Sequence, residues 1–430
     1  MIQKIDIDDL QAGMHICGLK NRSGASSFFM NNTLIKNAEE VASLKKKGFT
    51  AAYINIESVK TRPSARTEPG GGVAAGSEGP RTVELDNILR EAPAQDADAK
   101  PAEPVEAQTF TLKDPLDIKD EVGFREEIKE ARGIRDEAES TVTTIMHDVR
   151  MGKSLVKERM EKTVDNIVRS IFRNRDAITS LANLKRYDAY TFTHCVNVSI
   201  LSIALGRHLG LRREDLFKLG VGAILHDIGK MLIPEGLLNK PGAYNETELS
   251  LMKQHALLSA DFLAAARFIA LASIHVAGEH HERYDGSGYP AGLAGEKIHF
   301  FARIAGIADV YDAMTSNRIY QKAIMPTDTL KFMYTRRKIH FGPELVEKFI
   351  QCMGIYPIGS LVELSSGDIG LIKSVNRSDL IHPMVSVVLD RHKRPCRRPL
   401  DIDLATENKR RIIKAVDPEI YAVTVESINP

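Results

Sequence analysis

The stretch that decides the fold is Val221-Gly222-Ala223-Ile224-Leu225-His226-Asp227-Ile228-Gly229-Lys230. Its apolar first half predicts the end of a buried helix, which stops near the glycine. A His beside an Asp at such a helix end places an imidazole next to a carboxylate, and both groups are common metal ligands. The same residues also fit an ordinary helix end, at which the His stabilises the helix dipole. On this stretch alone, the two interpretations are equally open.

The distribution of histidines favours a metal site. Seven of the thirteen His residues lie between His194 and His281. Separate helical stretches in this part of the chain supply nitrogen and oxygen donors, which a helical bundle can bring together in its core. The candidate ligands are His194, His226, Asp227, His255, His280, His281 and Asp309.

The chemistry of this set predicts a dinuclear centre. One octahedral ion does not need seven protein ligands, but two ions that share Asp227 as a bridging carboxylate do. The set contains no thiolate, which favours iron, manganese or a similar first-row ion over structural zinc. Two such ions activate water at neutral pH and hold both the attacking and the leaving oxygen of a phosphoryl displacement. Phosphoester hydrolysis is therefore the leading prediction.

Each candidate also has a simpler interpretation. His194 lies within an apolar helix and could be a buried core histidine. The adjacent His280 and His281 are about 100° apart on a helix, so both reach one ion only near a helix end. Asp309 and Asp312 share a helix face and could be solvated or capping groups. The joint arrangement is much more specific than any one of these residues.

Composition sets the broad class of protein. A length of 430 residues predicts two or three domains. Lys plus Arg number 58 against 57 for Asp plus Glu, which gives no overall field that would favour a nucleic acid polymer or a membrane surface. The scattered cysteines favour reduced cytosol, and we find no apolar signal segment or membrane span. We therefore expect a cytoplasmic protein.

The predicted fold class is mainly α, with a small N-terminal α/β unit and a small C-terminal β module. Residues 1–57 predict the first unit, in which Val41 to Gly48 is helical and Ala51 to Ile56 is a strand. Residues 58–110 are rich in Pro, Gly and Ala and predict a flexible linker. Residues 355–430 predict short antiparallel strands. They are Ser360 to Leu364, Ile369 to Val375, Met384 to Leu389 and Ala422 to Val425.

Residues 111–185 predict a helical connector, and residues 186–354 the helical core domain. An apolar stripe runs along residues 118–182 at spacings of three and four, from Ile134 through Val149 to Ile171. Such a stripe indicates either a helix packed on its own domain or a helix that pairs with a second subunit. Within 186–354, Asn245-Glu246-Thr247-Glu248 predicts a capping box that starts the helix carrying His255.

Several motifs recur in one order along the core domain. They are His226-Asp227-Ile228-Gly229-Lys230, Leu238-Asn239-Lys240-Pro241-Gly242, Met252-Lys253-Gln254-His255, His280-His281-Glu282, Asp285-Gly286-Ser287-Gly288-Tyr289-Pro290 and Ala308-Asp309-Val310-Tyr311-Asp312-Ala313. In this order they resemble the HD-GYP branch of the HD metal-dependent phosphohydrolases. The N-terminal unit, with Asp9-Leu10-Gln11-Ala12-Gly13-Met14, is similar to an uncharacterised domain that often precedes HD-GYP domains in bacteria.

The resemblance implies a helical domain that hydrolyses the bacterial second messenger cyclic di-GMP to pGpG, and often onward to GMP. It implies that His194, His226, Asp227 and Asp309 surround one metal, and that Asp227, His255, His280 and His281 surround the other. It further implies that Lys230 acts beside the scissile phosphate. There, positive charge stabilises the charge that builds on the phosphoryl oxygens.

For the substrate, the resemblance implies contacts from Lys240, Arg318 and Lys322. It assigns the loop Gly288, Tyr289 and Pro290 to the pocket rim or to a docking surface for a diguanylate cyclase or another signalling protein. Members with a third metal carry Glu where this chain has Tyr190, so we predict two metals. Gln321 stands at a position that is commonly basic in the family.

The prediction is thus a bacterial cyclic di-GMP phosphodiesterase with two iron or manganese ions. One alternative is a cyclic di-GMP receptor that signals through protein partners with little turnover. The other is a phosphohydrolase that acts on a different cyclic nucleotide.

Overall fold

The computed structural model describes most of the chain. The described residues are 2–21, 26–55, 119–183, 190–317, 322–407 and 409–421. They fall into two compact units. One unit draws on Met1–Thr109 and Lys230–Gln254, and the other on Phe110–Gly229 and His255–Pro430. The predicted linker at 58–110 lies outside the described residues.

The N-terminal sheet has four antiparallel strands in the order β1-β4-β2-β3. Its elements are β1 (Ile2–Asp6), the 3-10 turn η1 (Ile7–Asp9), β2 (His15–Asn21), β3 (Ser26–Leu34), α1 (Ala38–Lys46) and β4 (Phe49–Asn55). Asn37 caps α1 by accepting a hydrogen bond from the amide of Glu40. Leu44 on α1 packs with Ile16 and Leu19 in the core of this sheet. The predicted helix and the strand after it are confirmed, the strand as far as Asn55.

The remaining elements of this unit are η4 (Ile228–Leu232), which begins two residues before the division between units, α8 (Glu235–Leu238) and α9 (Glu246–Lys253). The predicted capping box is confirmed, because Asn245 and Glu248 each accept a hydrogen bond from the other's backbone amide. The helix it starts does not carry His255. It ends at Lys253, and His255 begins a new helix.

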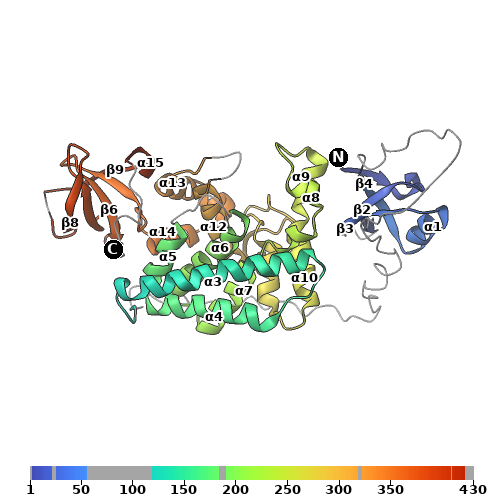
Figure 1. Cartoon of the computed structure of the whole chain (residues 1–430), viewed down its shortest axis with the longest axis horizontal. Helices are drawn as coiled ribbons and strands as arrows, with labels where there is room; N and C mark the ends of the chain where they lie inside the picture. Colours follow the sequence, from blue (N-terminus) through green and yellow to red (C-terminus); the bar gives the residue numbers. More distant parts are fainter. Residues whose placement is uncertain are drawn as a thin grey trace, which may run out of the picture. The chain divides into compact units, whose positions relative to one another are not determined.

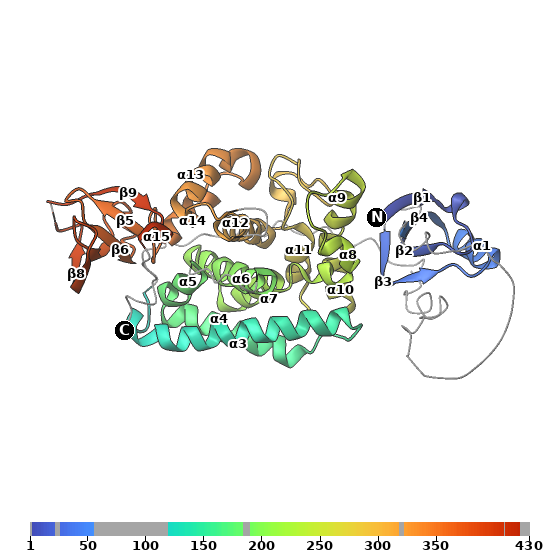
Figure 2. The same ribbon diagram turned by 45° about the horizontal axis from the view of Figure 1, so that its top comes forward.

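Residues 118–182 were predicted to be helical, and their described part forms three helices. These are α3 (Phe124–Arg150), α4 (Lys157–Arg173) and α5 (Arg175–Asn183). The chain turns back at Gly152, where φ is +77°, so α3 and α4 lie side by side (Figures 1 and 2). Buried positions of the apolar stripe face the neighbouring helices α4, α5, α6 and α7. Packing on its own unit therefore accounts for the stripe, and dimerisation through it stays a prediction.

The helical core is built around α6 (Tyr190–His208). It packs against α7 (Arg213–Ile224) and α12 (Phe300–Thr315). Around these lie α10 (His255–Ala265), α11 (Leu271–Glu279), η5 (Gly295–Lys297), α13 (Pro326–Arg336), the π-helical turn η6 (Arg337–Phe341) and α14 (Leu345–Met353). In this unit α11 contacts α7, α10 and α12, so segments far apart in sequence meet near its C-terminal end (Figure 2). The mainly α fold class is confirmed.

The C-terminal β module is a five-stranded antiparallel sheet in the order β8-β7-β6-β5-β9. Its strands are β5 (Leu361–Leu364), β6 (Ile369–Ser374), β7 (Met384–Leu389), β8 (Pro395–Asp403) and β9 (Ile412–Val416), and the short helix α15 (Pro418–Tyr421) follows. Strands β5 to β7 confirm the prediction, whereas β8 and β9 were missed. Most side chains of β8 are exposed, so it lacks the apolar alternation that identifies a strand. The predicted strand at Ala422 to Val425 lies outside the described residues.

Within the described ranges, every helix is too short or too polar to span a lipid bilayer.

Candidate metal centre

The structure brings all seven predicted metal ligands together in one unit. His194 lies on α6, and His226 and Asp227 lie in the turn that follows α7. His255 is the first residue of α10, His280 and His281 follow α11, and Asp309 lies on α12. The predicted convergence of separate helices is therefore observed, and both adjacent histidines stand at a helix end.

One group of donors consists of His194, His226 and Asp227, whose ligand atoms all lie within 4.8 Å of one another. Asp227 Oδ2 is 3.3 Å from His226 Nε2 and 4.0 Å from His194 Nε2. Asp309 joins this group, since its Oδ1 is 3.1 Å from His194 Nε2. Their side chains are at most 11% exposed, so the group is largely shielded from water.

The second group consists of His255, His280 and His281, whose ligand atoms also lie within 4.8 Å of one another. His281 Nε2 is 3.1 Å from His255 Nε2. Asp227 Oδ1 is 3.3 Å from His255 Nε2, so the two oxygens of Asp227 face the two groups. This is the arrangement expected of a carboxylate that bridges two ions.

The backbone orients two of these histidines toward the centre. His226 Nδ1 lies 2.7 Å from the carbonyl oxygen of Ala223, and His280 Nδ1 lies 2.9 Å from that of Ala277. A hydrogen bond at Nδ1 fixes the tautomer that presents the Nε2 lone pair to a metal. In the described part of the chain, Nε2 of both side chains is buried without a hydrogen-bond partner. Divalent ions bound by the two groups would satisfy both nitrogens, so the donor set fits metals.

A carboxylate that the sequence did not single out orients His194. Asp312 is fully buried, and its Oδ2 lies 2.7 Å from His194 Nδ1. Its Oδ1 accepts a hydrogen bond of 2.9 Å from the side-chain Nδ2 of Asn197. The simpler interpretation of Asp312 as a solvated or capping group is therefore wrong. Its spacing of three residues from Asp309 on one helix was the available signal.

The pKa values show how strongly the donors interact. Burial lowers the pKa of His194, but hydrogen bonds with Asp309 and Asp312 outweigh it and raise the pKa to about 9. Burial and the neighbouring His281 and His226 hold the pKa of His280 well below its usual range. For Asp309, the hydrogen bond from His194 and nearby imidazoles overcome burial and lower the pKa strongly. Asp309 is therefore anionic and His280 neutral at pH 7, as metal ligation requires, whereas a metal that binds His194 must displace its proton.

Gly229 explains how the His226-Asp227 turn comes so close to α10. A Cβ at this position would lie 2.2 Å from the carbonyl oxygen of His255 and 2.5 Å from the amide nitrogen of Ser259. Its own amide donates a hydrogen bond of 2.8 Å to Ser259 Oγ. Any larger residue would push the turn away from His255.

Of the motif loop Gly288, Tyr289 and Pro290, the tyrosine lies against the second donor group. Its ring centroid is 4.6 Å from that of His281 and 6.3 Å from that of His255. Its amide donates a hydrogen bond of 3.3 Å to the carbonyl oxygen of His281. Pro290 is exposed. The loop thus lies at the rim of the site, and its role in docking a partner stays a prediction.

The predicted substrate contacts are less clearly placed. Lys240 forms an ion pair with Glu248, the carboxylate that also closes the capping box of α9. Lys322 is exposed and its Nζ lies 3.6 Å from Asp417 Oδ2. Arg318 lies outside the described residues, and Lys230 is half-buried in η4. The roles of these four residues remain predictions.

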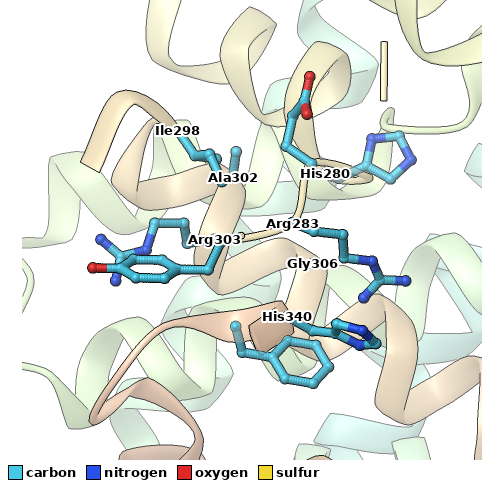
Figure 3. A pocket seen from close by; sticks show the side chains of 10 residues that line it. His280, Arg283, Ile298, Ala302, Arg303, Gly306 and His340 are labelled. Atoms are coloured by element: carbon cyan, nitrogen blue, oxygen red, sulfur yellow. The ribbon is translucent and has the colours of Figure 1, made fainter. Parts of the chain in front are cut away.

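A small pocket that is open to solvent lies beside His280 (Figure 3). Glu282, Arg283 and Tyr284 form one wall and η6 another, and Figure 3 shows Arg283 next to His340. Arg303 lies over the ring of Tyr284 and pairs with Glu296. Arg303 therefore connects the wall that contains Tyr284 with Glu296.

The fold and the donors define a class of protein, which the comparison with known families confirms. Residues 169–345 match the model of the HD domain. Residues 2–159 match a domain of unknown function, DUF3391, and residues 361–423 match a KOW domain associated with the HD domain. The predicted resemblances of the core and the N-terminal unit are thereby confirmed.

Three relatives indicate which HD proteins are similar. A protein named cyclic di-GMP phosphodiesterase from Pseudomonas aeruginosa is 38% identical over 62% of this chain and 64% of its own length. The cyclic di-GMP phosphodiesterase response regulator RpfG of Xanthomonas campestris is 37% identical over 42% of this chain and 48% of its own length. The 3'3'-cGAMP-specific phosphodiesterase 1 of Vibrio cholerae is 38% identical over 34% of this chain and 33% of its own length. This chain thus matches less than two thirds of the length of each.

Proposed function

We propose that this chain is a metal-dependent phosphodiesterase that hydrolyses cyclic di-GMP to pGpG, with GMP as a further product. The observation that carries the proposal is the position of Asp227 between two groups of buried donors. The names of the relatives from Pseudomonas and Xanthomonas support the choice of substrate.

In this proposal the centre holds two divalent ions, iron or manganese. His194, His226, Asp227 and Asp309 bind one, and Asp227, His255, His280 and His281 bind the other. Ions held in this way lower the pKa of water and stabilise the oxygens of a phosphoryl displacement. The protein supplies the rest: imidazoles fixed at Nδ1, a bridging carboxylate and a site shielded from solvent.

Around the centre, we assign Lys230 to the scissile phosphate, and Lys240, Arg318 and Lys322 to the substrate. The ion pair of Lys240 with Glu248 sets a condition on this assignment. Hydrogen bonds from Lys240 and from the amide of Asn245 hold the pKa of Glu248 below its usual range, so the pair is ionic at neutral pH. Substrate phosphate must therefore compete with Glu248 for the Lys240 ammonium.

The test is metal content together with product formation, on protein purified without air and incubated with cyclic di-GMP. We expect about two iron or manganese ions per chain, because the candidate ligands form two groups, and we expect pGpG or GMP to appear. Two ions and tight binding of cyclic di-GMP without product would instead identify a receptor that signals through partners. If the protein contained no metal and formed no product, the proposed metal centre would be refuted.

A second candidate is a phosphodiesterase for a different cyclic dinucleotide. The similarity to the 3'3'-cGAMP-specific phosphodiesterase 1 of Vibrio cholerae favours including it. Initial rates on cyclic di-GMP and 3'3'-cGAMP, measured side by side with the same protein, distinguish the two enzymes. A faster rate on the mixed dinucleotide would replace the first proposal with the second.

We further assign the protein to the bacterial cytoplasm, and the N-terminal unit to regulation. The Gly288, Tyr289 and Pro290 loop is proposed to dock a diguanylate cyclase or another signalling protein. A homodimer through residues 118–182 is proposed with less support, because the described stripe already packs within its own unit. Sedimentation of the full chain tests the dimer, and a pull-down with a loop variant tests the docking.

A further inference from the structure

A buried carboxylate next to the adjacent histidines has no part in the chemistry above. Glu282 directly follows His281 and is 7% exposed. Its Oε1 accepts hydrogen bonds of 2.7 Å and 3.1 Å from the amides of Ala291 and Gly292, and its Oε2 accepts one of 3.0 Å from the amide of Leu293. Three amides thus solvate this carboxylate inside the protein. An arrangement of this kind stabilises a buried charge.

These hydrogen bonds tie the far end of the motif loop back to its beginning. The loop also packs against the backbone of Glu282 and Arg283 at Gly288. A Cβ on Gly288 would lie 2.3 Å from the amide nitrogen of Arg283 and 2.5 Å from the Cα of Glu282. The loop is also held from outside, because the amides of Tyr284 and Asp285 donate to the carbonyl oxygens of His340 and Ile339. Figure 3 shows Arg283 and His340 close together on this side of the loop.

Tyr289 lies between the two points at which the loop is fixed. Its ring packs on His281 at a centroid distance of 4.6 Å and an angle of 31°. His281 has a more exposed side chain than the candidate ligands inside the bundle. Its exposed fraction is 21%, against 3% for His255 and 1% for His226. Its orientation therefore depends more on the loop than that of the ligands inside the bundle.

We propose that Glu282 is a positioning residue for the metal centre, which sets the motif loop so that Tyr289 holds His281 in its ligating orientation. It touches neither metal nor substrate. The inference rests on the proposed function in that it takes His281 as a ligand. It adds a structural role for Glu282, the carboxylate after the two histidines, and for Tyr289 in the loop.

The test is the affinity for Mn²⁺, measured by titration of the full chain after removal of bound metal. Glu282→Ala should weaken Mn²⁺ binding about 10- to 100-fold, as loss of an outer contact to a metal ligand does. Glu282→Gln should have a smaller effect, because its carbonyl oxygen can still accept from the amides of Ala291 and Gly292. Glu279→Gln is the matched control. Glu279 directly precedes His280 in the sequence and accepts a hydrogen bond of 2.7 Å from the amide of His299. Its replacement should leave the Mn²⁺ affinity unchanged.

A double variant separates positioning from a general loss of structure. If Glu282 acts through Tyr289, Glu282→Ala with Tyr289→Ala should bind Mn²⁺ no more than about twofold more weakly than Glu282→Ala alone. Hydrogen exchange of the amides at 291–293 should accelerate in Glu282→Ala even without metal. Unchanged Mn²⁺ affinity in Glu282→Ala, or effects of the two substitutions that multiply in full, would overturn the proposal. Because the readout is metal binding, it stays decisive even if the wild-type protein turned over no cyclic di-GMP.

Discussion

The two halves of the metal centre are held by different parts of the molecule. The half around His194, His226 and Asp309 is built on helices α6, α7 and α12, and its histidines are fixed by Asp312 and by a backbone carbonyl. The half around His281 lies where α11 ends, and a loop packs over it through Tyr289. The comparison shows that helix packing can pre-form one half. In the other half, the orientation of His281 depends on a segment without regular structure, which we expect to open locally at a lower free energy.

The largest expected effect comes from a pair of substitutions that includes Asp227, the carboxylate shared by both halves. His226→Ala with Asp227→Ala removes an imidazole and the bridging carboxylate, so both ions lose a ligand. We expect loss of metal and a fall in hydrolysis of roughly 10³-fold or more, because the metals carry the chemistry. Metal analysis and product formation measure the two effects.

Circular dichroism provides the control for this double variant. The helical signal should be mostly retained, because the helices pack through apolar residues such as Ile203, Leu219 and Ile304, which stay in place. Unchanged turnover in the double variant would contradict the dinuclear mechanism. An unfolded variant would call for the single substitutions instead.

The next effect sharpens the comparison within the helical half. Asp312→Asn keeps the size of the side chain but removes the carboxylate that accepts from His194 Nδ1. Metal affinity should fall about 10- to 100-fold, as is usual when an outer-shell partner of a ligating histidine is lost. Isothermal titration with Mn²⁺ measures this. Asp328→Asn, at an exposed position in the first turn of α13, is the control and should bind as the wild type does. Equal affinities in all three proteins would show that helix packing alone orients His194.

The sequence was sufficient to predict which residues cluster, because their chemistry and order are both unusual. Crowded histidines, a capping box and Gly residues at helix ends are local signals, and the structure brings all seven candidates together. The helical character of residues 118–182 was predicted, but the reversal between α3 and α4 was not, because the apolar stripe continues in period across the turn at Gly152. Periodicity reports the buried face and not where the chain reverses.

The supporting residues could not be predicted in the same way. Glu282 binds amides nine to eleven residues further along the chain, and Asp312 binds a histidine 118 residues away. Both look like ordinary solvated acids in the sequence, since no local pattern distinguishes a buried carboxylate from an exposed one. Strands β8 and β9 were missed for a related reason. Most side chains of β8 are exposed, so apolar alternation does not mark it as a strand. Strand β9 has a single buried residue and pairs with β5, which lies far away in the sequence.

The smallest expected effect uses a buried histidine away from the metal centre. His208 is 1% exposed, and its Nδ1 lies 3.4 Å from Arg175 Nη1. Burial, together with the cations Arg175, Arg377 and Lys348, lowers its pKa to about 3. Like His280, it needs no ion to remain neutral, and because it lies away from the metal centre its titration can be measured without metal.

Its titration makes a prediction with a definite sign. In the unfolded chain a histidine binds a proton below about pH 6.5, whereas folded His208 does so only near pH 3, so its contribution to stability is present above pH 6.5 and is lost as the pH falls toward 3. By pH 5 the loss is about 2 kcal/mol. In His208→Gln that loss cannot occur, so the stability difference between wild type and variant should shift by this amount between pH 7.5 and pH 5. Urea unfolding of both proteins in the presence of a chelator measures it without interference from metal release. A difference that does not change with pH would mean that the bundle tolerates a charged imidazole, and the neutrality of the ligand histidines would then need the metals themselves.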